Sequence, residues 1–195
     1  MADVIPLVVG DPGATKAKPV MLVDPSGNPI SSTVPTSVLG VSGCFATASF
    51  TPAAAAYSAN DIMGASAEFA FAFGNSVAIP AGSLIRILTA ITRIDITALQ
   101  ASEAGYQLQG YSATQPSAQA DNDAWTLASG DLTTYRGAIP LGTPVDLGGA
   151  LYIKSGSIDL DVRLVTSSLW ARLQTLAGFT ATAVARQVTL YGVVL

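Results

Sequence analysis

In the segment SIDLDVRLV (residues 157–165), aliphatic and charged side chains alternate strictly from Ile158 to Leu164. Successive residues of an extended chain point to opposite sides, so the aliphatic side chains share one side and the charged ones share the other. A helix would scatter the same residues around its axis. The segment therefore predicts a strand with one buried and one solvated side. The buried residues would be Ile158, Leu160, Val162 and Leu164, and the solvated ones Asp159, Asp161 and Arg163.

Short segments rich in β-branched and aromatic residues follow one another from about residue 41 onward, separated by turn residues. No segment has the periodicity of an amphipathic helix, although residues 129–135 have room for one helical turn. About eight or nine strands at this spacing predict an all-β fold, a jelly-roll-like β-sandwich. Residues 84–97 predict either two strands or one long strand with a bulge. The other expected strands are 44–51, 65–73, 106–111, 135–140, 149–154, 157–165, 169–176 and 187–194.

Three phenylalanines occupy alternate positions at the end of the segment 65–73, and this spacing places them on one side of a strand. The opposite side carries Ala70 and Ala72, and such a thin face would let a second sheet or subunit approach closely. We expect these two alanines at an assembly interface. The residues expected to anchor the core are Phe69, Phe71, Phe73 and, after a polar loop, Trp125.

Six of the eleven prolines fall within residues 1–40. The turn sequences DPG (11–13) and DPSGNP (24–29) lie in the same stretch, which is too interrupted for a core of its own. It is predicted to be an extended arm with a small β element, followed by a β-domain at residues 41–195. Two apolar strips in the arm are suited to adding a strand to a sheet edge. They consist of Val4, Ile5, Leu7, Val8 and Val9, and of Val20, Leu22 and Val23.

Charged residues make up only 11% of the chain, which has a net charge of −4 and no cluster of lysine or arginine. Binding to nucleic acid is not expected, because each phosphate contact needs a cation. No run of about 18 apolar residues is uninterrupted, so no membrane span is expected. An apolar chain with so little charge is prone to associate, which favours an assembly component made inside a cell. Cys44 lies in an apolar strand and is expected to be a small buried hydrophobe.

The chain contains no histidine, which excludes nucleophiles activated by histidine and metal sites with imidazole ligands. It also has no glycine-rich loop followed by Lys-Ser or Lys-Thr to hold a nucleotide phosphate. We therefore expect no enzymatic activity, cofactor, metal or small-molecule substrate. A glycosidase remains an alternative because it needs only two carboxylates. The candidates are Glu68, Glu103 and the pair Asp159 and Asp161.

A short acidic cluster, Asp121-Asn122-Asp123, precedes Trp125. Calcium binds clustered carboxylate and amide oxygens, so the cluster is an alternative metal site. The glycine and glutamate of an EF-hand loop do not follow at the required spacing. Asx turns explain the same residues, and we expect that role for them.

Several segments together resemble the head decoration, or cement, proteins of tailed bacteriophages. They are YSANDIMG (57–64), the strand 84–97, PSAQADNDAWTLASGDL (116–132) and TATAVARQVTLYGVV (180–194). The resemblance covers roughly residues 44–195, and these motifs specify turns and packing rather than chemistry. PVMLVDPSGNPI (19–30) is similar to a segment near the N-termini of phage virion proteins. The resemblance implies a jelly-roll-like domain, bound as a homotrimer to the outside of a capsid, with the major capsid protein as its partner.

These features favour a structural virion protein, made in the host cytoplasm, that reinforces the capsid lattice by bridging capsid subunits. The arm would pair with a neighbouring subunit or with the capsid. The alternative from another class is a carbohydrate- or receptor-binding β-sandwich of a phage tail or a cell surface. Such a protein would display aromatic and amide side chains grouped on its loops.

Overall fold

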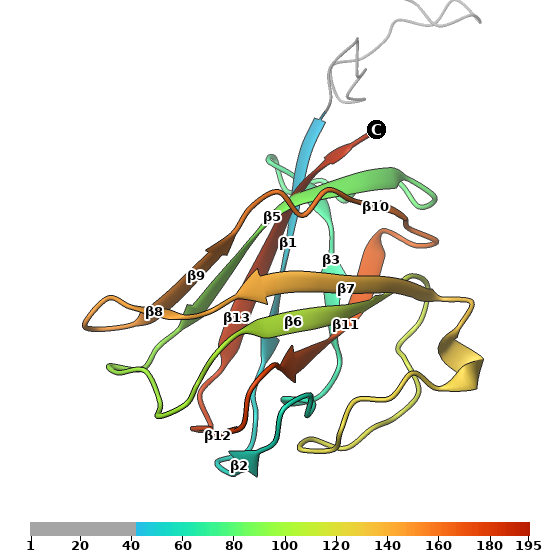
Figure 1. Cartoon of the computed structure of the whole chain (residues 1–195). Coiled ribbons are helices and arrows are strands. Elements are labelled where there is room, and N and C mark those ends of the chain that lie inside the picture. Colours follow the sequence, from blue (N-terminus) through green and yellow to red (C-terminus); the bar gives the residue numbers. More distant parts are fainter. Residues whose placement is uncertain (1–41) are drawn as a thin grey trace, which may run out of the picture. The chain divides into compact units, whose positions relative to one another are not determined.

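The computed structural model describes residues 42–195 (Figure 1). A division of the chain into two units falls between Gly40 and Val41. No helix in the described part is long and apolar enough to cross a membrane. The residues of the two apolar strips lie outside the described part. They are Val4, Ile5, Leu7, Val8, Val9, Val20, Leu22 and Val23.

The described part is almost entirely β-structure and forms two main antiparallel sheets. The large sheet consists of β1 (Ser42–Phe50), β4 (Ala72–Phe73), β5 (Leu84–Ile94), β8 (Val145–Asp146), β9 (Leu151–Ser155), β10 (Leu160–Arg163) and β13 (Arg186–Val194). The small sheet consists of β3 (Ala67–Ala70), β6 (Tyr106–Tyr111), β7 (Tyr135–Gly142) and β11 (Ser168–Thr175). A two-stranded ribbon joins β2 (Ala56–Tyr57) and β12 (Phe179–Thr180), and η1 (Ser129–Asp131) is one turn of 3-10 helix.

The strand pairing is that of a long hairpin wrapped into a sandwich, which is the topology of a jelly roll. Antiparallel pairings are nested around the β6–β7 hairpin: β5 with β9 and β10, then β3 with β11, then β1 with β13. Two further pairings, β5 with β13 and β6 with β11, join these strand pairs into the two sheets. The orders are β4-β1-β13-β5-β9-β8 and β3-β11-β6-β7. The predicted all-β, jelly-roll-like sandwich is confirmed.

Inward-facing side chains of both sheets form one apolar core. Phe69 and Phe71 are buried in it, where they were expected, whereas Phe73 is only partly buried against its edge. Cys44 is buried on β1, and this burial raises the pKa of its thiol to about 11.

The strand predicted at residues 157–165 is shorter in the structure, because only β10, Leu160–Arg163, is extended and Asp159 has a left-handed backbone (φ 50°). Val162 and Leu164 are buried, Ile158 and Leu160 pack partly buried against the core, and the charged side chains are exposed, as predicted.

The segment 65–73, predicted as one strand, is instead two short strands in different sheets. β3 pairs with β11 in the small sheet and β4 pairs with β1 in the large sheet, with Phe71 between them. Ala70 therefore lies on the outer face of the small sheet, and Ala72 lies beside Phe45 on the outer face of the large sheet. The two alanines do not share the single thin face that the sequence predicted, because the chain changes sheets between them.

Residues 84–97 contain one long strand with a bulge, the second of the two predicted forms. The register between β5 and β13 shifts at Gly192, and Leu88 is the extra residue of β5. A Cβ atom on Gly192 would lie 2.5 Å from the carbonyl oxygen of Arg86, closer than any side chain tolerates. Glycine therefore permits the two strands to stay paired across the bulge.

Candidate functional site

The outer face of the small sheet is covered by the chain's own loop, residues 112–134, which connects β6 to β7. Arg172 on β11 is buried beneath this loop and donates hydrogen bonds to the carbonyl oxygens of Ser117 (2.7 Å) and Gln119 (3.4 Å). Burial lowers the pKa of Arg172. The guanidinium group thus fastens the loop to the sheet.

Trp125 fixes the second half of the same loop. Its indole N–H donates to the hydroxyl of Tyr111 over 3.1 Å, and its ring lies 5.9 Å from the ring of Tyr135. Trp125 is only partly buried, and its partners lie on the outer face of the small sheet. It therefore anchors the loop to the sheet and does not anchor the core, where the sequence placed it.

Glutamine side chains form a polar layer between the small sheet and the segments that cover it. The side-chain oxygen of Gln174 accepts hydrogen bonds from the amides of Gln107 and Gln109, both over 2.6 Å. The amide of Gln174 donates to the carbonyl oxygen of Asn60, and the hydroxyl of Tyr135 donates to Gln109. β6, with the sequence YQLQGY, is therefore polar on one side because that side contacts polar groups of the chain that cover the small sheet, rather than the core.

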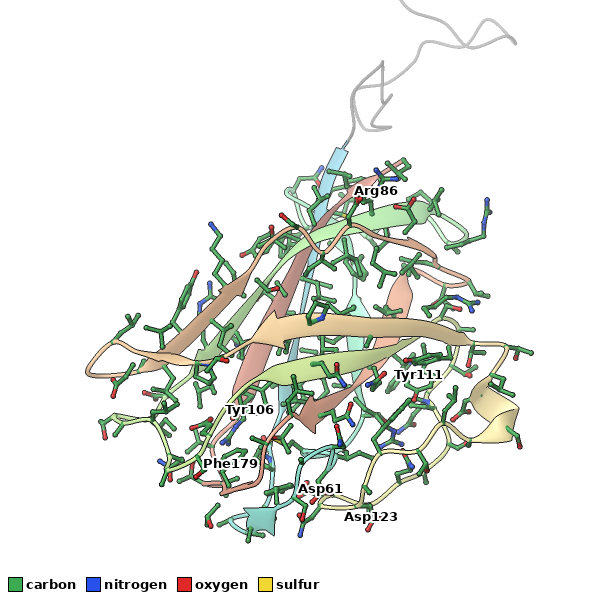
Figure 2. All side chains as sticks on the ribbon, viewed as in Figure 1. Asp61, Arg86, Tyr106, Tyr111, Asp123 and Phe179 are labelled. Carbon is green, nitrogen blue, oxygen red and sulfur yellow. The ribbon has the colours of Figure 1, made fainter. Side chains whose placement is uncertain are left out.

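Two of the segments that resemble decoration proteins contain the same turn. In each, an asparagine in the left-handed conformation (Asn60, φ 73°; Asn122, φ 71°) precedes an aspartate that accepts a backbone N–H three residues earlier. The turns dock on each other, with the N–H of Ile62 donating to the carbonyl oxygen of Asp123 over 2.9 Å. Figure 2 shows Asp61 and Asp123, one from each turn, at the same end of the sandwich.

Asp121, in the second turn, binds residues on either side of the first turn through both of its side-chain oxygens. It accepts hydrogen bonds from the backbone N–H groups of Ala53 (2.7 Å) and Gly64 (2.6 Å) and from the hydroxyl of Tyr57 (2.8 Å). The carboxylate is thus a fastening point for residues 51–64. Within residues 42–195, no group of three or more Cys, Asp or Glu side chains is placed to hold a metal ion.

The same end of the sandwich holds a buried polar and aromatic cluster (Figure 2). The ring of Phe179 lies 6.3 Å from that of Tyr57 and 6.2 Å from that of Tyr106. The hydroxyl of Tyr106 donates to Glu103, and burial together with this carboxylate raises the pKa of Tyr106. Arg186 is fully buried beside them and donates to two backbone carbonyl oxygens, over 2.8 and 2.6 Å.

The carboxylates considered for glycosidase chemistry have structural roles or stand alone. Asp161 accepts two hydrogen bonds from Arg86, over 2.6 and 2.8 Å, and Arg86 lowers the pKa of Asp161. Asp159 lies 3.4 Å from the same guanidinium group. Glu103 is buried and hydrogen-bonded, as described above, and Glu68 is exposed on β3. Arg163, which follows Asp161 on the same side of β10, forms neither ion pair.

The outer face of the large sheet carries no such covering within residues 42–195. Phe45 on β1 and Tyr191 on β13 are directly opposite each other, 37% and 38% exposed, with ring centres 6.3 Å apart. The side chains next to this pair are small, hydroxylated or aliphatic, and charged side chains lie only toward the ends of the face, where Arg86 on β5 is paired with Asp161 at one end. We call this surface the uncovered face. It consists of Phe45, Thr47, Ala72, Thr89, Ile91 and Tyr191, with the buried Thr189 between them.

Two cations border the uncovered face at its other end. Arg93 follows Ile91 on the same side of β5. Lys154 lies on the neighbouring strand, β9, directly opposite Ile91. Neither forms an ion pair with a residue of the described chain, although the exposed Asp95 is close in sequence. An open hollow of about 400 Å³ lies beside Arg93 and is also lined by Asp95 and Gln187. This end of the face thus has two cations near one carboxylate, and neither cation forms an ion pair within residues 42–195.

No protein-family model matches the chain, and no curated protein is significantly similar to it. Sequence reasoning identified Ala72 but not the aromatic pair beside it. The sequence does contain a signal for this aromatic pair, because Phe45 shares the polar side of β1 with Thr47 and Ser49. Tyr191 likewise falls on the same side of its strand as Gln187, so both aromatic residues stand out among polar neighbours.

Proposed function

We propose that this protein is a structural virion protein that binds the outer surface of a phage capsid as a homotrimer. There it contacts the major capsid protein and reinforces the lattice by bridging capsid subunits. The observation that carries the proposal is the asymmetry of the sandwich, with one sheet covered by its own loop and the other exposing a face with two aromatic rings and uncharged side chains beside them. Exposed apolar patches of this kind are typical of protein–protein interfaces.

The segments that resemble decoration proteins support this function through their structural roles. Residues 57–64 and 116–132 form the two docked turns and supply Asp121 and Trp125, which fasten the covering loop. A binding protein that acts by rigid contact needs such fastening and needs no titrating catalytic group. The hydrogen bonds made by Glu103 and Asp121 agree with that role, since both carboxylates are engaged within the fold.

Imaging tests the proposal directly. Particles from cells that produce the protein, and particles from cells that lack its gene, should be compared by electron cryo-microscopy. We expect threefold density on the capsid exterior in the first set only. Particles without it should release DNA at a lower temperature, because a ligand that binds only the assembled state stabilises that state.

Two variants of similar surface chemistry sharpen this comparison. Tyr191→Asp places a charge on the uncovered face and should reduce the density, whereas Leu132→Asp, at a site 60% exposed in the covering loop, should not. Density at the tail, or particles equally stable with and without the protein, would contradict the proposal.

The second candidate function, binding of a carbohydrate or receptor, is favoured by one observation. Trp170 lies on the outer face of the small sheet directly opposite Tyr111, and Trp125 contacts the same tyrosine. Both tryptophans are partly exposed. A change of tryptophan fluorescence on adding oligosaccharides, abolished by Trp170→Ala, would support this function over the first.

A further inference from the structure

The uncovered face has a complementary segment in the sequence of the same protein. Residues 3–11 read DVIPLVVGD, a short apolar strip with an aspartate at each end. In an extended chain, alternate residues share one side, so Ile5, Leu7 and Val9 would form an apolar row between Asp3 and Asp11. No lysine or arginine interrupts this row.

The spacing of this row matches the uncovered face. Leu7 is four residues from each aspartate, which is about 13 Å in an extended chain. Thr89, the β5 neighbour of Tyr191, is likewise four residues from Arg93 on the same strand. A segment lying along β5 with its central leucine beside Tyr191 would therefore bring an aspartate to Arg93.

We propose that residues 3–11 of one copy dock, extended, on the uncovered face of a neighbouring copy. Ile5, Leu7 and Val9 cover the Phe45–Tyr191 pair and the side chains beside it, and a terminal aspartate pairs with Arg93 and Lys154. The inference rests on that part of the proposed function in which copies of this chain associate, and it does not depend on the capsid.

The length of the chain allows this exchange. Asp11 is 31 residues before Ser42, where β1 begins, and that many residues span up to roughly 100 Å when extended. In a ring of three copies, each chain would contribute one segment and each uncovered face would receive one. Such head-to-tail contacts form a closed ring in which every uncovered face is occupied. Association also raises the local concentration of each segment near its neighbour.

Disulfide trapping between two kinds of copy tests the contact. A chain carrying Leu7→Cys and a differently tagged chain carrying Tyr191→Cys are co-expressed, and mixed disulfide-linked pairs are counted after oxidation. The native Cys44 is buried and does not compete. The matched control replaces Tyr191→Cys by Leu132→Cys, an exposed position in the loop over the opposite sheet. We expect at least tenfold more mixed pairs with Tyr191→Cys than with the control.

The outcomes separate this inference from the proposed function. Equal yields at the two positions, or a cross-link formed only when Leu7→Cys and Tyr191→Cys share one chain, would overturn docking on a neighbour. If light scattering shows a trimer without the cross-link, the inference fails and the proposed trimer stands. If it shows a monomer and no mixed pairs form, both fail.

A charge exchange tests the ionic part of the contact. Lys154→Glu should weaken self-association by up to about fivefold, the range of exposed ion pairs. Adding Asp3→Lys or Asp11→Lys to the same chain should restore it, and the substitution that does so gives the direction of the segment. If both lysine substitutions weaken association further, the proposed pairing is refuted.

Discussion

Replacing Asp121 should lower the free energy of unfolding, because its side chain holds together the end of the sandwich where the two turns dock. Its carboxylate accepts three hydrogen bonds, from Ala53, Gly64 and Tyr57, over 2.7, 2.6 and 2.8 Å. Hydrogen bonds to charged groups contribute about 1.5–3 kcal/mol each when buried. These are exposed or partly buried, so we take the lower end and expect Asp121→Ala to reduce the free energy of unfolding by about 3–5 kcal/mol.

The neighbouring aspartate supplies the control. Asp123 accepts one longer hydrogen bond, 3.2 Å from the N–H of Ala120, in an exposed turn. Asp123→Ala should therefore cost only about 0.5–1 kcal/mol. Asp121→Asn keeps one acceptor oxygen and should fall between the two. Urea unfolding followed by tryptophan fluorescence measures all three, because Trp125 lies in the loop that Asp121 holds.

Two results would refute this reasoning. If Asp121→Ala and Asp123→Ala cost the same, the three short hydrogen bonds do not stabilise the fold as argued. If calcium raises the stability of the wild type and a chelator lowers it, while Asp121→Ala is insensitive to both, Asp121 is a metal ligand. The acidic cluster would then be the calcium site that the sequence left open as an alternative.

Three other outcomes are expected. Phe71→Ala should destabilise the fold by about 3–5 kcal/mol in urea unfolding, as for other large-to-small core changes, and an unchanged midpoint would place Phe71 outside the core. Ala72→Arg should impair self-association measured by light scattering without changing the unfolding midpoint, while Ala70→Arg, on the other sheet, should do so less. Burial raises the pKa of Tyr57 and Tyr106 above 10, so stability should be full below about pH 10 and fall above it. The fall should reach about 1.4 kcal/mol per pH unit for each tyrosine, and equal urea midpoints at pH 9 and pH 11 would contradict it.

The parts of the fold that the sequence predicted are those fixed by local patterns. The alternation at residues 157–165 identified the four residues of β10 and their two sides, because in an extended chain each residue's direction depends only on its neighbours, although the strand is shorter than predicted. The crossing at Phe71 has no such local signal. Whether Ala70 and Ala72 belong to one sheet or two depends on β11 and β1, which are distant in the sequence. The sequence therefore predicted one thin face for Ala70 and Ala72, whereas the structure places them on the outer faces of two different sheets.

The candidate site was less predictable for a related reason. Trp125 is an aromatic residue after a polar loop, a pattern that fits a core anchor and a loop anchor equally well. Only its contacts with Tyr111 and Tyr135, on the outer face of the small sheet, decide between them. The polar strand β6 shows the same dependence, because Gln107 and Gln109 are satisfied by Gln174 from β11. Long-range partners, not local propensity, settle which side of a strand is covered.

The strands that end the two sheets bear on how an arm would bind. β4 and β8 have two residues each, and β3 and β10 have four. β7 has eight residues, but Pro140 lacks the N–H that an added strand would need. β10 carries Asp161 and Arg163, and charged edges oppose strand addition. These edges are poor templates, whereas the uncovered face extends over β1, β5 and β13, of nine, eleven and nine residues. The strip at residues 3–11, predicted from the sequence to add a strand at a sheet edge, would gain more contact area on this face than on any of these edges, and this favours docking through side chains where the partner is another copy of this chain.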